Sequence, residues 1–134
     1  MDSGEYILQK INTGVFTDPE KLMDNIVNVT EFLRKKITAQ GGNPDRKTLT
    51  VVKTVDGSNL YRAENGEVFR VYKYIPDSVS VNGCPGLDRI YSAAKSFGNF
   101  QSMLKDYPAD SLFEIIPDFH DTPKRFEALM RAIA

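Results

Sequence analysis

The segment from residue 48 to residue 75 limits the possible folds of this chain more than any other. Two dipeptides in it, Asp56-Gly57 and Asn65-Gly66, separate short runs that are rich in β-branched and aromatic residues. Such pairs adopt the positive φ angles that tight hairpin turns need. The sequence therefore predicts an antiparallel meander with strands at residues 48–55, 60–63 and 67–75.

A long amphipathic helix is predicted before these strands. Its apolar residues recur at spacings of three and four, which places them on one helix face: Leu22, Ile26, Val29, Leu33 and Ile37. At its start, Thr17 and Glu20 fit a capping box, and Pro19 suits the first turn. Gly41-Gly42 is typical of a helix end.

Residues 5–12 are predicted to form another strand. Apolar residues fall on both of its faces, which indicates a central position in a sheet. The sequence Asp2-Ser3-Gly4 is typical of a hairpin turn, but only Met1 precedes it. We therefore expect the chain to begin inside a hairpin whose first strand is missing.

Helices are predicted again after a loop at residues 76–85. One stripe of mainly apolar residues begins at Leu87 and ends at Leu104, interrupted by Gly98. Residues 112–116 are interpreted as a further helical turn. A last helix is predicted from Asp121-Thr122-Pro123, with Phe126, Leu129, Met130 and Ile133 on one face. Strands and helices together predict an α+β fold.

The composition excludes several kinds of partner. The net charge is −1, so no basic surface for nucleic acid or anionic membrane is expected. No apolar run has the length of a membrane span, and the first residues lack the features of a signal peptide. Cys84 is the single cysteine, which fits a reducing compartment and an inert thiol. These features predict a cytoplasmic protein.

Three segments are distinctive: YILQKIN at residues 6–12, RVYKYI at residues 70–75 and FHDTPKRFE at residues 119–127. They resemble the front part of bacterial N-acetylhexosamine 1-kinases, which belong to the aminoglycoside phosphotransferase and choline kinase-like family. The resemblance implies a kinase-like amino-terminal lobe without its first hairpin at residues 1–76. A hinge or linker at 77–86 and the helical start of the second lobe at 87–134 would follow.

For function, the resemblance implies a parent enzyme that transfers the γ-phosphoryl group of ATP, with Mg²⁺, to a sugar. The anomeric hydroxyl of an N-acetylhexosamine is the expected acceptor. In this family the catalytic aspartate and the magnesium ligands lie in later segments, which these 134 residues do not contain. We therefore expect a kinase fragment that is inactive alone and binds no cofactor tightly.

The nucleotide site implied by the resemblance includes Gln9 and Lys10. In kinases a strand lysine holds the α- and β-phosphates, and a glutamate on the next helix holds that lysine. Gln9 stands where relatives carry the lysine, and Lys10 faces the opposite side because adjacent strand residues alternate. Either Lys10 substitutes or the phosphates are held differently. Glu20 and Glu31 are both candidates for the helix glutamate.

The hinge implied by the resemblance includes Tyr74, Ile75 and Asp77, whose backbone would bind the adenine edge; Pro76 has no N–H to donate. His120 is the only histidine, and we interpret it as structural. Asp121 or Thr122 is the expected cap of the last helix.

A second hypothesis belongs to another class of protein. The chain would be a non-catalytic binding or interaction domain that uses a kinase lobe as its scaffold. In either case, we expect self-association through the sheet edge that the missing hairpin leaves exposed.

Overall fold

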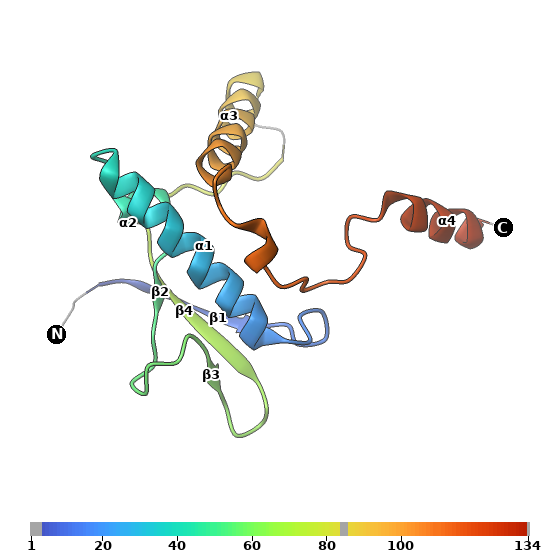
Figure 1. Cartoon of the computed structure of the whole chain (residues 1–134), viewed down its shortest axis with the longest axis horizontal. Coiled ribbons are helices and arrows are strands. Elements are labelled where there is room, and N and C mark those ends of the chain that lie inside the picture. Colours follow the sequence, from blue (N-terminus) through green and yellow to red (C-terminus); the bar gives the residue numbers. More distant parts are fainter. Residues whose placement is uncertain (1–3, 84–85, 134) are drawn as a thin grey trace.

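One long helix crosses one face of a four-stranded antiparallel sheet (Figure 1). This computed structural model describes residues 4–83 and 86–133. In chain order the elements are β1 (Tyr6–Ile11), α1 (Pro19–Ala39), α2 (Pro44–Lys47), β2 (Val51–Val52), β3 (Tyr61–Arg62), β4 (Val68–Lys73), α3 (Leu87–Leu104), a 3₁₀ turn (Ala109–Ser111) and α4 (Thr122–Ile133). The predicted α+β fold class is confirmed.

β4 is the central strand of the sheet. β1 pairs with one of its edges, and β2 and β3 follow one another along the other edge. The β3–β4 hairpin turns at Gly66, which has φ +82° as predicted. The predicted meander is wrong in its pairing, because β2 pairs with β4 instead of β3. Its first strand is also shorter than the predicted range 48–55, since β2 covers only Val51–Val52. The turn at Asp56-Gly57 closes a local loop from Thr54 to Ser58, so the chain returns to β4 beyond the end of β2.

β1 lies at an edge of this sheet, so its predicted central position is wrong for the described residues. It pairs with β4 from Tyr6↔Lys73 to Ile11↔Val68, and no described strand pairs with its other edge. The side chain of Leu8 remains 68% exposed. The apolar residues of β1 are therefore not all buried by the described part of the chain.

The N-cap of the long helix α1 lies one residue later than predicted. Asp18, and not Thr17, is the N-cap, and its Oδ1 accepts a hydrogen bond from the Lys21 amide at 3.0 Å. Pro19 at the first helical position explains the shift, because the cap is the residue before it. The helix ends at Ala39, and Gly41 with φ +72° continues the chain as predicted.

The core lies between α1 and the sheet. Met23 of α1 is buried against Ile11 of β1 and Val68 of β4. Leu33 and Ile37 are buried further along the same helix. Each such side chain contributes roughly 1.5–3 kcal/mol of stabilisation when it is fully buried.

The later helices contribute nothing to this core. α3 spans residues 87–104 as predicted and continues through Gly98, but neither α3 nor α4 contains a buried residue. The predicted helical turn at 112–116 is wrong, because the turn occurs at residues 109–111 and Leu112 is extended. Pro117 disfavours helical backbone at the residue before it, which opposes a turn there.

The end of α3 is attached to α1 by polar and aromatic contacts. Lys36 donates to the carbonyl oxygen of Met103 at 2.8 Å and pairs with Asp106 at 2.7 Å. This hydrogen bond lowers the pKa of the Asp106 carboxyl. The ring of Tyr107 packs edge-on against Phe32, with centroids 5.1 Å apart.

Asn25 makes the next attachment. Its side-chain Nδ2 donates to the carbonyl oxygen of Phe113 at 2.8 Å, and its Oδ1 accepts from the Phe113 amide at 3.0 Å. One α1 side chain thus satisfies both polar groups of a residue 88 positions away. Asn25 therefore determines where the chain runs after α3.

We predict that Asn25→Ala lowers the free energy of unfolding by about 1–2 kcal/mol, because it removes two hydrogen bonds. Asn28→Ala is the matched control, since Asn28 is an exposed residue of the same helix and gains the same helix propensity from alanine. Urea unfolding of both variants is the measurement. Equal stability of the two would contradict the assigned role of Asn25.

We also predict self-association through the free edge of β1, with a second copy of the chain as the partner. Leu8→Lys places a charge on this edge strand, which opposes strand pairing between chains. Sedimentation across a concentration series should show a weaker dimer for this variant than for the parent chain. Val55→Lys, at a fully exposed turn residue, is the control and should change nothing. A parent chain that stays monomeric at high concentration would refute the prediction.

Candidate functional site

Gln9 and Lys10 lie on opposite faces of β1, in line with the predicted alternation. Gln9 faces α1, where its Oε1 accepts hydrogen bonds from Nε and Nη2 of Arg70 at 3.0 and 2.9 Å. Lys10 forms an ion pair with Glu67, whose pKa this contact lowers. Of the two candidates, only Gln9 shares a face with the long helix.

The helix glutamates pair with neither residue in the described part of the chain. Glu20 accepts a hydrogen bond from Nη2 of Arg62 at 2.5 Å, across to β3. Glu31 lies 11 residues further along α1, which corresponds to roughly 16 Å of helix. The two candidates therefore lie at different ends of the sheet, and Glu20 already forms an ion pair with Arg62.

The predicted hinge residues directly follow β4. The amide of Tyr74 donates to the carbonyl oxygen of Glu5 at 2.9 Å, so this N–H extends the sheet. The amide of Ile75 forms no hydrogen bond with any part of the chain that the structure describes. Asp77 has a positive φ of +57°, and its Oδ2 lies 3.7 Å from Nη1 of Arg46. The amides of Ile75 and Asp77 are therefore both without a hydrogen-bond acceptor among the described residues, whereas that of Tyr74 is used.

Gln9 and the hinge lie along one direction of the sheet. Gln9 is the partner of Arg70 in β4, and Tyr74 comes four residues later. At the rise of a strand this separation is roughly 13 Å. The predicted residues therefore do not meet at one point, and Lys10 faces away from the others. A ligand that contacted both Gln9 and the hinge would have to span this distance.

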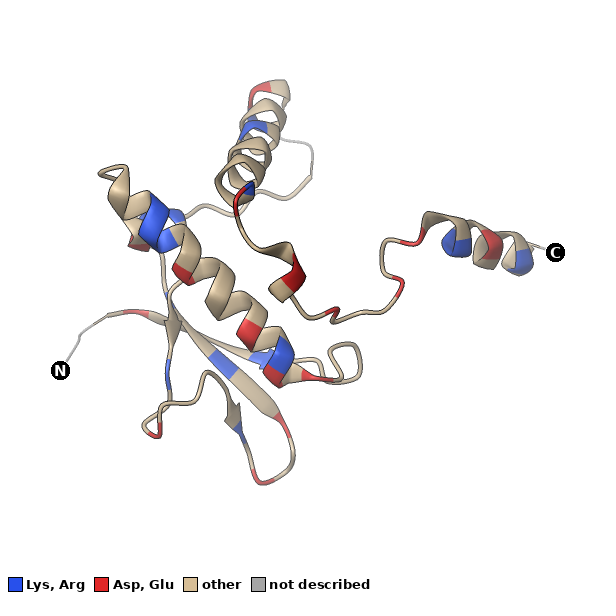
Figure 2. Ribbon diagram, in the orientation of Figure 1, with Lys and Arg blue, Asp and Glu red and all other residues tan. Residues whose placement is uncertain are grey.

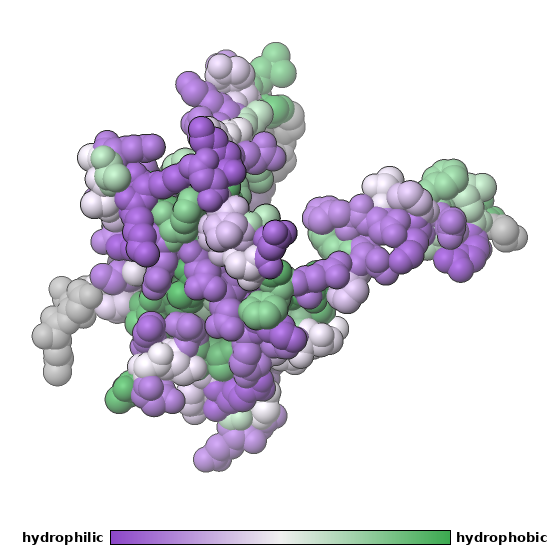
Figure 3. Space-filling model, viewed as in Figure 1, coloured by the Kyte–Doolittle hydropathy of each residue, from purple (hydrophilic) through white to green (hydrophobic). Residues whose placement is uncertain are grey.

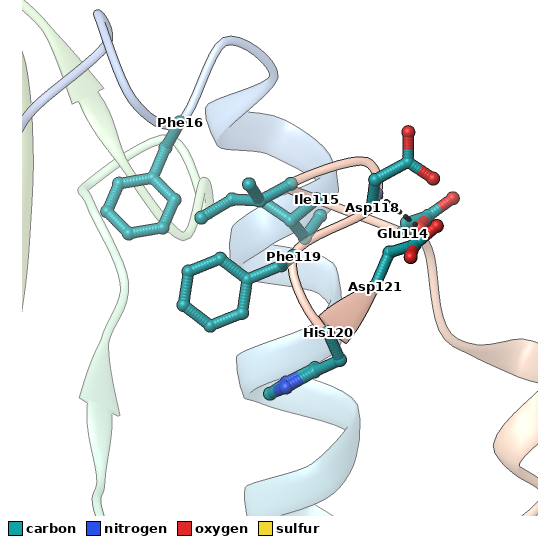
Figure 4. Close-up of a pocket in the computed structure, with 8 residues that line it drawn as sticks. Phe16, Glu114, Ile115, Asp118, Phe119, His120 and Asp121 are labelled. Carbon is teal, nitrogen blue, oxygen red and sulfur yellow. Dashed lines mark hydrogen bonds between the residues drawn. The ribbon is translucent and has the colours of Figure 1, made fainter. Parts of the chain in front are cut away.

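A separate hollow of about 490 Å³ lies beside Phe16 and the segment before α4 (Figure 4). The rings of Phe16 and Phe119 lie on one side, and the carboxylates of Glu114, Asp118 and Asp121 gather on the other. Asp121 accepts from the Lys124 amide at 3.0 Å, which confirms it as a cap of α4. This hollow was not predicted from the sequence.

The acidic side of this hollow is partly neutralised. The ammonium group of Lys124 lies 2.9 Å from Asp118 and 3.5 Å from Asp121. The ring of His120 packs edge-on against Phe119, with the ring centroids 4.9 Å apart, and its structural role stays a prediction. In residues 4–83 and 86–133, no group of three or more His, Cys, Asp and Glu side chains is arranged to hold a metal ion.

Charges of both signs are interspersed along the ribbon (Figure 2). Within the described ranges, none of the helices is both long enough and apolar enough to cross a membrane. Cys84 lies outside the described residues. No known protein-family model matches the sequence.

Arg70 is the residue that the sequence analysis missed. It belongs to the RVYKYI segment, but nothing local in the sequence connects it with Gln9. That connection depends on the register between β1 and β4, which pairs residues 61 positions apart.

Proposed function

We propose that this chain is the front part of an ATP-dependent small-molecule kinase. The proposed acceptor is a sugar hydroxyl, in the first place the anomeric hydroxyl of an N-acetylhexosamine. The observation that carries the proposal is the arrangement of β1, α1 and β4. A strand that bears the YILQKIN segment pairs with the strand that leads into the linker, and the long helix packs on both. This is the order of elements that a kinase amino-terminal lobe requires.

The linker supports a place for the adenine edge. The amide of Ile75 is an open donor, Pro76 has none, and the Tyr74 amide is already used by Glu5. An adenine ring at this position would leave the phosphates to extend along the sheet toward Gln9. The sugar would be bound by residues outside this lobe.

Magnesium and the catalytic aspartates are not assigned to these residues. Among the described residues, no three or more His, Cys, Asp and Glu side chains are grouped around a possible metal position. Under this proposal a later segment of a longer protein supplies both groups. The cytoplasm, where ATP is abundant and Cys84 would stay reduced, is the proposed location.

A non-catalytic interaction domain is the second candidate, and the apolar surface of the later helices favours it. Both α3 and α4 project from the sheet with apolar patches on them (Figure 3). Phe126 and Ile133 are exposed, and an apolar hollow of about 530 Å³ lies between α1 and Phe100. Such surface is typical of an interface with another protein or with a further part of the same one.

The DNA after the codon for Ala134 separates the two candidates. An in-frame histidine-x-aspartate segment, followed by a second aspartate segment for magnesium, would support the kinase. A stop codon would support the interaction domain.

We predict that a protein of these 134 residues alone has no kinase activity. Phosphoryl transfer depends on positioning and charge stabilisation, and the groups that provide both are assigned to a later segment. ATP consumption with N-acetylglucosamine and N-acetylgalactosamine is the measurement. Turnover that co-purifies with the chain would show that the catalytic groups lie within these residues.

We also predict that nucleotides bind weakly, with a dissociation constant of about 1 mM or more. A site formed by one lobe leaves much of the adenine in water, so little of its surface is buried. Titration of the isotopically labelled chain by NMR measures affinities in this range. Micromolar binding would mean that one lobe is sufficient.

A further inference from the structure

Arg70 is a partly buried cation without a carboxylate partner in the described part of the chain. Its Nη1 lies 3.9 Å from the sulfur of Met23, and its guanidinium carbon lies 5.1 Å from the centre of the Tyr72 ring. A fully buried charge is normally paired with an opposite charge, and Arg70 is partly withdrawn from water. Its surroundings here are a thioether, an aromatic ring and the neutral amide of Gln9, so the charge is left uncompensated.

Gln9 fixes the orientation of this cation. One oxygen, Oε1, accepts from both Nε and Nη2, which holds one edge of the planar guanidinium against β1. A guanidinium has five N–H groups, so donors at Nη1 and Nη2 remain for another acceptor. The planar fork of arginine suits bidentate binding of phosphate oxygens.

The neighbouring cations are already neutralised. Lys10 pairs with Glu67 on the far face of the sheet, and Arg62 pairs with Glu20. Lys21, in the first turn of α1, pairs with Asp18 at 3.0 Å. Among the described residues, Arg70 is therefore the cation on the α1 face of β1 and β4 that no opposite charge compensates.

We propose that Arg70, positioned by Gln9, binds phosphate oxygens of the nucleotide. This inference rests on the proposed kinase function and names the group that takes the place of the strand lysine. In other kinases the lysine would lie on the strand that corresponds to β1. Here the positive charge lies on the neighbouring strand β4, on the same face of the sheet. Gln9 is a positioning residue, because its amide orients the guanidinium and carries no charge. The distance of roughly 13 Å to the linker leaves room for an extended nucleotide between them.

The test is an NMR titration of the isotopically labelled 134-residue chain with two probes, ATP without added metal and adenosine. The parent chain, meaning these 134 residues without substitution, should bind ATP more tightly than adenosine. This preference should weaken as salt is added. Arg70→Gln should lower the affinity for ATP about tenfold or more, to that for adenosine, because it removes a charge-assisted contact. Arg62→Gln is the matched control, since its charge is already paired with Glu20.

Gln9→Glu gives the sharpest distinction from a structural role. The carboxylate has the shape of the amide and would form an ion pair with Arg70, so the fold should be kept. The pair would neutralise the guanidinium, and the preference for ATP over adenosine should disappear. A residue that only stabilises the sheet would not lose ATP binding in this way. If Arg70→Gln fails to fold, this variant decides alone.

The outcomes separate this inference from the proposed function. If Arg70→Gln or Gln9→Glu binds ATP as the parent chain does, Arg70 is not the phosphate ligand, but the nucleotide site stands. Equal affinity of the parent chain for ATP and adenosine would likewise show that Arg70 does not bind the phosphates. If the parent chain binds neither compound even at about 20 mM, this inference fails. The kinase proposal is then decided separately, by the DNA after the codon for Ala134.

Discussion

The contact of Met23 with Ile11 and Val68 joins the three elements on which the rest of the structure depends. Met23 and Val68 are 1% and 0% exposed, and Ile11 is 4% exposed. Truncation of such a side chain to alanine costs about 2–5 kcal/mol, a large share of the stability of a small domain. The same contact brings α1 over the paired residues Gln9 and Arg70. Packing and the candidate site therefore share one cause.

Most of the elements could be predicted from local signals in the sequence. The apolar stripe that begins at Leu22 correctly predicted the long helix, and the turn at Asn65-Gly66 correctly predicted the β3–β4 hairpin. Prediction failed where the outcome depended on distant partners. Two strand positions depend on such partners: β2 pairs with β4, and β1 lies at the edge of the sheet. Both depend on which strands compete for β4, and the periodicity of one strand does not encode this. The short helix α2 was missed because its four residues are too few to show a period.

The candidate site was predictable only along a single strand. Alternation correctly separated Gln9 from Lys10, because it is a property of any strand. The pairing of Gln9 with Arg70 required the register, and the commitment of Glu20 to Arg62 required the position of β3 against α1. The hollow at Phe16 and Phe119 combines residues from opposite ends of the chain, which no local pattern connects.

The buried surface of the described residues is unevenly distributed along the chain. Every buried hydrophobic residue lies between Ile11 and Tyr72 in the described part of the chain, while α3 and α4 bury none. Yet both helices have clear amphipathic stripes, and a stripe is stable only when something covers it. Lys36 and the Phe32–Tyr107 ring contact attach the end of α3 to α1, and Asn25 holds the segment that follows at Phe113. The described residues therefore form one core with two uncovered amphipathic helices attached to it. Under the kinase proposal the second lobe covers these helices, and under the alternative another protein does.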